Sequence, residues 1–313
     1  MKHFIDFADA GDPMELVEKA VNIKKNPLRT RLGTDKVLGL VFFNSSLRTR
    51  MSTTRAAYNL GMQVMTLNVT QDSWQLEMQD GTVMDRGAAE HIREAAAVMG
   101  LYTDILGVRS FPSLQDRESD YKEELIHTFK RLSGVPIVNL ESATVHPLQS
   151  LADLITIQEL KDKNNPKIVL TWAPHIKALP QAVANSFCQW MLGTGADLHI
   201  TQPQGMELSD HFTRGAKLYD NQEEALEGAD FVYVKNWSSF RRYGEIYQDN
   251  AWMINLQKLG MTNKAGLMHC LPVRRNLVIS DDALDSDHSL VLRQAENRIF
   301  AAQVVLQEIL NTI

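Results

Sequence analysis

A chain of 313 residues is long enough for two domains of ordinary size, each with its own hydrophobic core. Its hydrophobic share of 44% and charged share of 22% are those of a soluble globular protein, which excludes disordered and fibrous chains. The formal net charge of -6 argues against a nucleic-acid partner.

The first residues contain acids at Asp6 and Asp9, where a signal peptide needs an uninterrupted apolar core. The sequence has no apolar run of about 18 residues that could cross a bilayer. We therefore expect a cytoplasmic protein with no membrane partner. The two cysteines, Cys188 and Cys270, are too few for a disulfide framework and do not have metal-ligand spacing. We expect neither a metal nor a cofactor.

Strand-like runs alternate with helical patterns along the whole chain, which predicts an α/β protein of two domains, each a parallel sheet flanked by helices. We expect a first domain at 1–147, a second domain at 148–290 and a C-terminal helical segment at 291–313. The predicted strands are 37–43, 63–69, 104–109, 136–141, 167–172, 197–202, 216–219, 230–234 and 266–269.

Helices are predicted at 47–60, 89–99, 148–160, 181–192 and 295–313. Gly61 and Gly100 are expected to end the first two of these, because glycine favours the position that follows a helix. Pro147 suits the first turn of the third helix. Residues 70–91 lack a firm periodic pattern, and their Asp80-Gly81 pair predicts a loop that leaves the domain.

The predicted strand 37–43 is followed by a turn at Asn44 and Ser45 and then by a helix rich in hydroxyl groups and arginines. Ser46, Arg48, Thr49 and Arg50 would join the backbone N–H groups of the helix start around one point, which is typical of a phosphate site. Neither Gly-x-x-x-x-Gly-Lys-Ser/Thr nor Gly-x-Gly-x-x-Gly follows this strand, so nucleotide binding is disfavoured.

Ser46-Leu-Arg-Thr-Arg50 resembles the Ser-Thr-Arg-Thr-Arg motif of the aspartate and ornithine carbamoyltransferases. Three further motifs of that family follow in its order, and they are His146-Pro-Leu-Gln149 with Asp153, His269-Cys-Leu-Pro272 and Ala295-Glu-Asn-Arg298. The resemblance implies a C-terminal helix that crosses back to the first domain. It also implies carbamoyl transfer in arginine biosynthesis.

Carbamoyl phosphate is a dianion whose carbonyl must be polarised before an amine attacks it, so its site needs fixed cations and a hydrogen-bond donor. By resemblance, the catalytic residues are His146, Arg48, Cys270 and Arg298. The residues that the resemblance assigns to carbamoyl phosphate are Ser46, Leu47, Arg48, Thr49, Arg50, Trp74, Arg109, His146, Gln149, Cys270, Leu271 and Arg298. His269 would point away from Cys270 if both lay in a strand, which favours a non-covalent role for the thiol.

The second substrate should lack a free α-ammonium group. Ornithine carbamoyltransferases carry Ser-Met-Gly near the site of that group, whereas this chain has Lys235-Asn-Trp, and a lysine repels an ammonium ion. N-acylation masks the amine. The wider pattern resembles the N-acylornithine branch of the family, N-succinylornithine above all. That branch implies contacts to the acylated amino acid from Glu141, His175, Lys235, Arg274, Trp74 and Glu90.

The family also implies a homotrimer in which the loop with Trp74 and Glu90 enters the neighbouring subunit's site. The Glu90 carboxylate would repel the free carboxylate of a succinyl group, which favours N-acetylornithine. The alternative for Glu90 is that it starts the next helix, where an acid is favourable. Two alternatives for function stay open, namely a catalytically silent relative that binds carbamoyl phosphate and a carbamoyltransferase for free ornithine.

Overall fold

The computed structural model describes residues 1–27 and 30–313. The chain separates into two compact units. Unit 1 comprises Met1–Pro112, Ser119–Leu148 and Arg298–Ile313, and unit 2 comprises Ser113–Glu118 and Gln149–Asn297. The expectation of a two-domain α/β protein is confirmed.

Unit 1 is built on a parallel four-stranded sheet in the order β2-β1-β5-β6. These strands are β1 (Val37–Phe42), β2 (Gln63–Asn68), β5 (Ile105–Arg109) and β6 (Ile137–Glu141). The central strands β1 and β5 are buried almost throughout, as is usual for parallel strands with helices on both faces.

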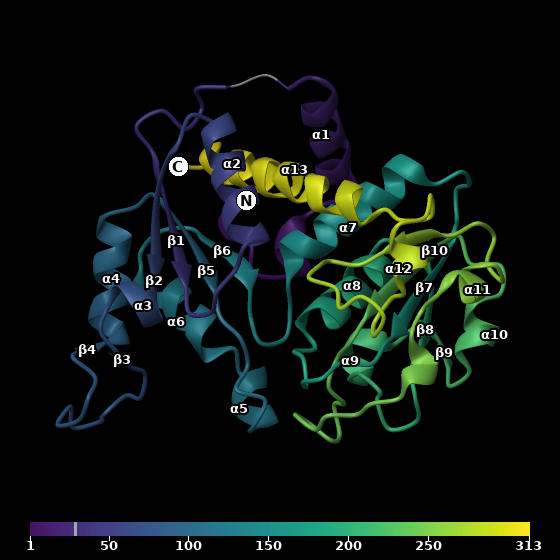
Figure 1. The fold of residues 1–313 in the computed structure, drawn as a ribbon. Helices are drawn as coiled ribbons and strands as arrows, with labels where there is room; N and C mark the ends of the chain where they lie inside the picture. Colours follow the sequence, from purple (N-terminus) through teal and green to yellow (C-terminus); the bar gives the residue numbers. More distant parts are fainter. Residues whose placement is uncertain (28–29) are drawn as a thin grey trace. The chain divides into compact units, whose positions relative to one another are not determined.

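Two groups of helices cover this sheet (Figure 1). Helices α4 (Ile92–Leu101) and α6 (Glu124–Leu132) share a core with Val41, Leu106 and Val108 of the sheet. The C-terminal part of α13 (Val291–Leu310) lies against α1 (Pro13–Lys25) and α2 (Arg48–Asn59). Hydrogen bonds of 2.9 Å join Gln303 to Asn59 and Glu308 to Lys19. The C-terminal helix therefore returns to the first unit, as expected.

Two glycines that were both predicted to end helices have different roles. Gly61 follows the end of α2 with φ 83°, which is the left-handed conformation expected there. Gly100, in contrast, lies inside α4, and a Cβ atom at this position would be 1.8 Å from the carbonyl oxygen of Ser133. The prediction that Gly100 ends the helix is wrong, because this glycine is needed for the close approach of α4 to the end of α6.

Residues 70–91 contain more regular structure than their sequence predicts. Short elements occur there at α3 (Val69–Asp72), β3 (Leu76–Glu77) and β4 (Glu90–His91). Two other short helices lie elsewhere in the chain, at η1 (Phe7–Ala10) and α5 (Arg117–Tyr121). Strands β3 and β4 pair with each other in parallel, and α4 begins only at Ile92 with His91 as its N-cap. Glu90 is therefore not in the first turn of the helix.

Unit 2 is built on a parallel five-stranded sheet in the order β11-β10-β7-β8-β9. Its strands are β7 (Lys167–Trp172), β8 (Asp197–Thr201), β9 (Lys217–Tyr219), β10 (Phe231–Lys235) and β11 (Gly266–Met268). Its helices are α7 (Pro147–Leu160), which begins in unit 1, α8 (Ala182–Gly193), α9 (Asp210–Thr213), α10 (Gln222–Leu226), η2 (Asn250–Trp252), α11 (Leu256–Leu259) and α12 (Asp281–Leu284).

One face of this sheet packs against α10, α11 and α12 in a single apolar cluster that includes Val169, Val232 and Val234. On the other face, the ring of Phe187 of α8 packs at a tilt against Tyr233 of β10, with 4.4 Å between ring centroids. The strands are thus buried on both sides, which explains their continuous apolar runs.

Each sheet has one point at which the direction of strand addition reverses. In unit 1 this point lies between β1 and β5, and in unit 2 it lies between β7 and β10. The loops at the carboxyl ends of such neighbouring strands diverge, and ligands of open α/β sheets bind there. The strand order therefore marks one candidate site in each unit.

Candidate active site

Arg109, the last residue of β5, holds the turn that follows β1. Its Nη1 atom donates to the carbonyl oxygens of Asn44 (3.0 Å) and Ser45 (2.5 Å). Its Nε and Nη2 atoms donate to the carboxylate of Glu141, at 3.2 and 2.8 Å. Most donors of the guanidinium group are thus used within unit 1. Arg109, which the resemblance gives as a phosphate ligand, is a fixed positive charge that positions the turn.

The turn leads into the N-terminus of α2, which begins at Arg48. Leu47 occupies the N-cap, and its side chain makes no hydrogen bond to the first backbone N–H groups of the helix. These groups carry partial positive charge and suit an anion such as phosphate. The Leu47 side chain is 67% exposed, so only its backbone is suited to this role.

Two further predicted residues on α2 have partners within unit 1. Thr49 is buried, and its hydroxyl accepts a 2.6 Å hydrogen bond from Nη2 of Arg298 on α13. This bond brings the last of the four sequence motifs to the first. Arg50 donates to the side chain of Asn68 at the end of β2 and lies over the ring of Phe42.

His146 lies directly before α7 and is enclosed, with 3% of its surface exposed. Its pKa is well below the usual value of 6.5, because burial disfavours the imidazolium form and because Arg298, Arg109 and Arg48 are close. The nearest carboxylate, that of Glu141, is 3.8 Å from Nε2. Within the described part of the chain, Nδ1 has no hydrogen-bond partner. A neutral imidazole surrounded by arginines can donate one N–H to a ligand carbonyl.

In unit 2, three predicted residues gather at the carboxyl ends of the strands where the sheet reverses. Lys235 ends β10 and is buried, and its ammonium donates to the carbonyl oxygen of Asn236 at 2.8 Å. His175 follows β7, and its Nε2 atom accepts a 3.2 Å hydrogen bond from Nε of Arg274. Burial, offset in part by a hydrogen bond with the Lys177 carbonyl, lowers the pKa of His175, and the nearby cations lower it further. The group is therefore a neutral histidine between cationic side chains, which suits a carboxylate.

Cys270 and Leu271 follow β11, which ends at Met268. Neither His269 nor Cys270 is in the strand, so the condition under which His269 would point away from Cys270 is not met. Instead, Nδ1 of His269 accepts a 2.8 Å hydrogen bond from the backbone N–H of Leu271. Leu271 adopts φ 54°, a conformation that branched residues rarely take and that often marks a functional loop.

Sequence reasoning missed a buried polar network in unit 2. Asp153 accepts hydrogen bonds from Gln149 (2.7 Å) and Gln294 (2.6 Å), and Gln294 in turn accepts one from the backbone N–H of His269 (2.9 Å). Tyr233 lies beside Asp153, and burial followed by the influence of Asp153 and Cys270 raises its pKa well above 10. The signal for Gln294 was its place one residue before the Ala295-Glu-Asn-Arg298 motif.

Trp74 and Glu90 meet across the loop between β2 and α4. The indole Nε1–H donates to the Glu90 carboxylate at 2.8 Å, although the Trp74 side chain is more than half exposed. The loop therefore presents an aromatic ring and a carboxylate as one unit.

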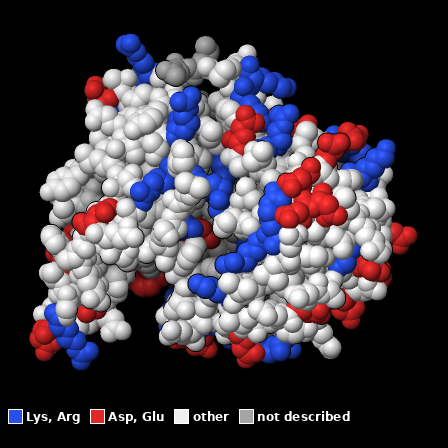
Figure 2. Space-filling model, viewed as in Figure 1, with Lys and Arg blue, Asp and Glu red and all other residues white. Residues whose placement is uncertain are grey.

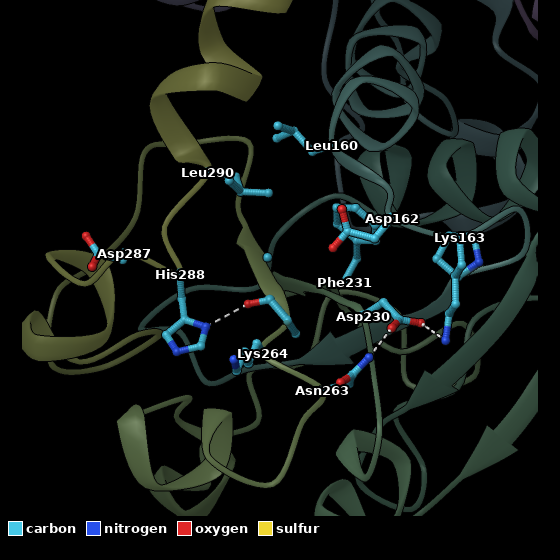
Figure 3. A pocket seen from close by; sticks show the side chains of 13 residues that line it. Leu160, Asp162, Lys163, Asp230, Phe231, Asn263, Lys264, Asp287, His288 and Leu290 are labelled. Atoms are coloured by element: carbon cyan, nitrogen blue, oxygen red, sulfur yellow. Dashed lines mark hydrogen bonds and ion pairs between the residues drawn. The ribbon is translucent and has the colours of Figure 1, made fainter.

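A cavity of about 570 Å³ lies at the opposite edge of the unit 2 sheet, where β10 and β11 begin. Figure 3 shows Asp230 at its wall, paired with Lys163 at 2.7 Å and with Asn263 at 2.8 Å. None of the predicted site residues lines this cavity. The polar groups at its wall bind one another and hold the loops that precede the strands. We therefore place the candidate active site at the carboxyl ends of the strands and not in this cavity.

Other features of the described residues limit the classes of site. Within 1–27 and 30–313, no helix is both long and apolar enough to span a membrane. Over the same part of the chain, no group of three or more His, Cys, Asp and Glu side chains is arranged to hold a metal ion. On the face drawn in Figure 2, basic and acidic side chains are interspersed.

Comparison with family models gives two matches that together span most of the chain. Residues 2–159 match the carbamoyl phosphate binding domain of the aspartate/ornithine carbamoyltransferases. Residues 179–309 match the Asp/Orn binding domain of the same family. The two matches correspond to the two halves of the chain that carry the sites described above.

Individual relatives match over nearly their whole length. N-succinylornithine carbamoyltransferase of Bacteroides thetaiotaomicron is 48% identical, with 99% of each chain covered. N-acetylornithine carbamoyltransferase of Xanthomonas axonopodis is 33% identical, with 98% of this chain and 96% of the relative covered. A crystal structure of a mutant N-acetyl-L-ornithine transcarbamylase with carbamyl phosphate and N-succinyl-L-norvaline superimposes with a TM-score of 0.93 at 33% identity, covering 99% of this chain and all of the other. The chain belongs to the aspartate/ornithine carbamoyltransferase family and is a carbamoyl-transferring enzyme.

Proposed function

We propose that the protein transfers the carbamoyl group of carbamoyl phosphate to the side-chain amine of an N-acyl-L-ornithine, giving N-acyl-L-citrulline and phosphate, in the cytoplasm and as a step of arginine biosynthesis. The observation that carries this proposal is the cationic character of the unit 2 site. Lys235 and Arg274 flank a neutral His175 there. An α-ammonium group would be repelled, whereas an acylated amine is neutral and leaves a carboxylate that these cations attract.

Carbamoyl phosphate is assigned to the unit 1 site. The first turn of α2, with Ser46, Arg48, Thr49 and Arg50, would hold the phosphate. Neutral His146 would donate its N–H to the carbonyl oxygen, where negative charge grows as the amine attacks. Arg298, which is already fixed to Thr49, adds positive charge beside the same oxygen.

The reaction needs no covalent intermediate on the protein. The amine nitrogen forms a bond to the carbonyl carbon, the bond from that carbon to the phosphate oxygen breaks, and the departing phosphate accepts the proton that the amine loses. In this proposal, Cys270 and the Leu271 carbonyl orient the amine and the carbamoyl nitrogen. Gln149 contacts the carbamoyl group. Positioning and fixed charge supply most of the acceleration.

The choice of acyl group depends on Glu90. Two of the relatives, from Bacteroides thetaiotaomicron and Bacteroides fragilis, act on N-succinylornithine by name and are 48% and 47% identical. In the mutants of N-acetyl-L-ornithine transcarbamylase solved with N-succinyl-L-norvaline, a glutamate is replaced by Ala, Pro, Ser or Val. We propose that Glu90, fixed by the hydrogen bond from Trp74, repels a succinyl carboxylate and favours the acetyl compound.

We also propose a homotrimer in which the loop that carries Trp74 and Glu90 completes the site of a neighbouring subunit. The support is an exposed apolar surface on unit 1. Leu47, Met51 and Tyr58 follow one another along one face of α2, and each is more than half exposed. Met65 is equally exposed on β2, an edge strand. Such surfaces are usually covered by another chain.

The substrate proposal is tested by comparing N-acetylornithine, N-succinylornithine, free ornithine, aspartate and putrescine as amines in the presence of carbamoyl phosphate. Lys235→Met should raise KM for the acylated amine at least tenfold, and Lys235→Arg should raise it less. Neither change should alter KM for carbamoyl phosphate. Efficient carbamoylation of free ornithine without any use of acylated amines would contradict the proposal. No turnover with any amine would favour the catalytically silent alternative.

The shared site of the trimer is tested by mixing two inactive variants. At an acylated-amine concentration well below the KM of the parent protein, Trp74→Ala and Lys235→Met should each have little activity alone. When the two are unfolded, mixed and refolded together, some sites receive an intact Trp74 from one chain and an intact Lys235 from another. Activity should therefore return in the mixture. Failure to recover activity, or a fully active monomer in sedimentation, would contradict the proposed assembly.

A further inference from the structure

The segment from Ser142 to Val145 joins β6 to His146 and is buried along its whole length. It is closed by a hydrogen bond of 2.9 Å from the backbone N–H of Ser142 to the carbonyl oxygen of Val145. Loops are normally exposed, because a buried loop leaves backbone groups that need partners. This loop therefore depends on polar groups supplied from elsewhere in unit 1.

Asn139 supplies one of them through a 2.9 Å hydrogen bond to the Ser142 hydroxyl, and most of the others come from one carboxylate, that of Glu123. Its oxygens accept hydrogen bonds from the backbone N–H groups of Ala143 (3.1 Å) and Thr144 (2.6 Å). They also accept hydrogen bonds from the hydroxyl groups of Ser142 (2.8 Å) and Thr144 (2.5 Å). Three of these bonds end on Oε1 and one on Oε2, so both oxygens of the carboxylate bind the loop.

The backbone of Glu123 has an unfavourable conformation for a residue with a side chain. It adopts φ 52° and ψ 33° at the position that precedes α6. This left-handed region favours glycine, and other residues keep it only where their surroundings enforce it. The four bonds to the loop are such a constraint, because they fix the side chain of Glu123 and with it the backbone.

The loop leads into His146, whose N–H is proposed to donate a hydrogen bond to the carbamoyl oxygen. His146 follows Val145 directly, and Glu141, which pairs with Arg109, precedes Ser142. The imidazole is buried and its Nδ1 atom has no partner among the described residues, so its own hydrogen bonds do little to orient it. Its orientation must come mainly from the backbone on which it is carried.

We infer that Glu123 is a positioning residue for carbamoyl transfer, which sets the place of His146 by binding the loop that presents it. This inference rests on the proposed function. Glu123 touches neither substrate in that function and acts only through the loop. No sequence signal singles out Glu123, because it is one of several charged residues around the start of a helix.

The test compares Glu123→Gln with Glu124→Gln, its neighbour on the surface of α6, whose carboxylate accepts a hydrogen bond from Thr128 instead. Glutamine places an NH₂ group against at least one donor of the loop. We expect kcat to fall about tenfold or more in Glu123→Gln, with KM for carbamoyl phosphate nearly unchanged, because displacement of a positioned group slows the chemical step. Glu124→Gln should behave as the parent protein.

A double-mutant comparison separates positioning from general damage. In a His146→Ala background, Glu123→Gln should lower kcat much less than in the parent, because the group it positions is absent. Equal losses in both backgrounds, or no loss in either, would overturn the inference. If Glu123→Gln does not fold, Thr144→Val removes one of the four hydrogen bonds and should give a smaller loss with the same dependence on His146.

A readout that does not depend on activity distinguishes this inference from the proposed function. Hydrogen exchange at the amides of Ala143 and Thr144 should be faster in Glu123→Gln than in Glu124→Gln, and the NMR signals of the His146 ring should shift only in the former. Unchanged exchange and unchanged ring signals would overturn the inference. Faster exchange in a protein that transfers no carbamoyl group to any amine would overturn the proposed function and keep the role of Glu123 in placing His146.

Discussion

The indole N–H of Trp74 donates a 2.8 Å hydrogen bond to the carboxylate of Glu90, so the two side chains of the loop proposed to meet the acyl group are fixed to each other. Glu90 belongs to the short strand β4 rather than to α4. Its carboxylate is therefore held by a side chain and not by a helix N-terminus.

This pair leads to a prediction about acyl specificity. Glu90→Ala should raise kcat/KM for N-succinylornithine relative to N-acetylornithine by about tenfold or more, because removal of one of two like charges relieves repulsion in a partly enclosed site. Trp74→Phe keeps an aromatic ring but releases Glu90, so its effect should have the same direction and be smaller. Kinetics with both amines provide the measurement. An unchanged ratio in Glu90→Ala would reject this role and leave carbamoyl transfer intact.

Arg48 and His146 should have separable kinetic roles. Arg48→Ala removes a charge-assisted contact to phosphate and should raise KM for carbamoyl phosphate by about tenfold or more. His146→Ala should instead lower kcat by a similar factor, because its hydrogen bond strengthens only as the carbonyl oxygen becomes negative. Steady-state kinetics in carbamoyl phosphate distinguish the two. Parental kinetics in both variants would place the site elsewhere.

The pairing of Arg109 with Glu141 predicts a large effect on stability. Arg109→Met should lower the free energy of unfolding by about 3–5 kcal/mol, because it leaves the buried Glu141 carboxylate without its partner. The double variant Arg109→Met with Glu141→Gln should recover part of this loss. Denaturant unfolding measures both. If the double variant were as unstable as Arg109→Met alone, the charge of Glu141 would not be the cause of the loss.

His146 makes stability depend on pH in a defined direction. Its pKa in the folded protein is lowered, first by burial and then by three arginines, whereas the unfolded chain titrates near 6.5. Below pH 6.5 the unfolded state therefore binds a proton that the folded state does not. The contribution of His146 to the free energy of unfolding should be fully present above pH 6.5. Below that pH it should fall by about 1.4 kcal/mol per pH unit, until the pKa of His146 in the folded protein is reached.

The contribution of His146 to this slope is isolated by comparison with His146→Gln. His3, His175 and His199 also have lowered pKa values and contribute in both proteins. Urea unfolding between pH 5.5 and 7.5 should give a slope that is smaller by up to about one proton in the variant. An identical slope in the two proteins would mean that folded His146 titrates normally.

Gly100 gives a prediction about packing. In Gly100→Ala the new Cβ would be 1.8 Å from the carbonyl oxygen of Ser133, so α4 must move. A loss of about 1–3 kcal/mol or more is expected, as for other overpacked sites. Gly87→Ala, whose Cβ would be in ordinary contact with Gln75, is the matched control and should have little effect. Thermal unfolding of the two variants measures the difference.

The fold class and the place of most strands could be read from the amino-acid sequence alone. Buried parallel strands read as short apolar runs, and the runs at 37–43 and 167–172 needed no knowledge of their neighbours to be recognised. The amino-acid sequence also showed which residue types gather near the chemistry. A phosphate or a carbonyl oxygen needs particular donors, and the four motifs supplied them in order along the chain.

The partners that hold these side chains in place are visible only in the tertiary structure. The resemblance predicts that Arg109 binds phosphate, and the fold adds that its donors also hold Asn44, Ser45 and Glu141. Gly100 appeared to end a helix, yet it lies within one where another chain segment passes closely. In both cases the deciding partner is more than 30 residues away in sequence, and local periodicity carries no information about it.

The same reason explains why Glu123 and the charge state of His146 were invisible to sequence reasoning. A carboxylate that precedes a helix looks like a surface residue until the loop at 142–145 is placed against it. A histidine has an ordinary pKa until burial and the arginines of three separate segments act on it together. Residue type can be read along the chain, whereas hydrogen-bond partners, burial and electric field depend on distances that only the folded chain defines.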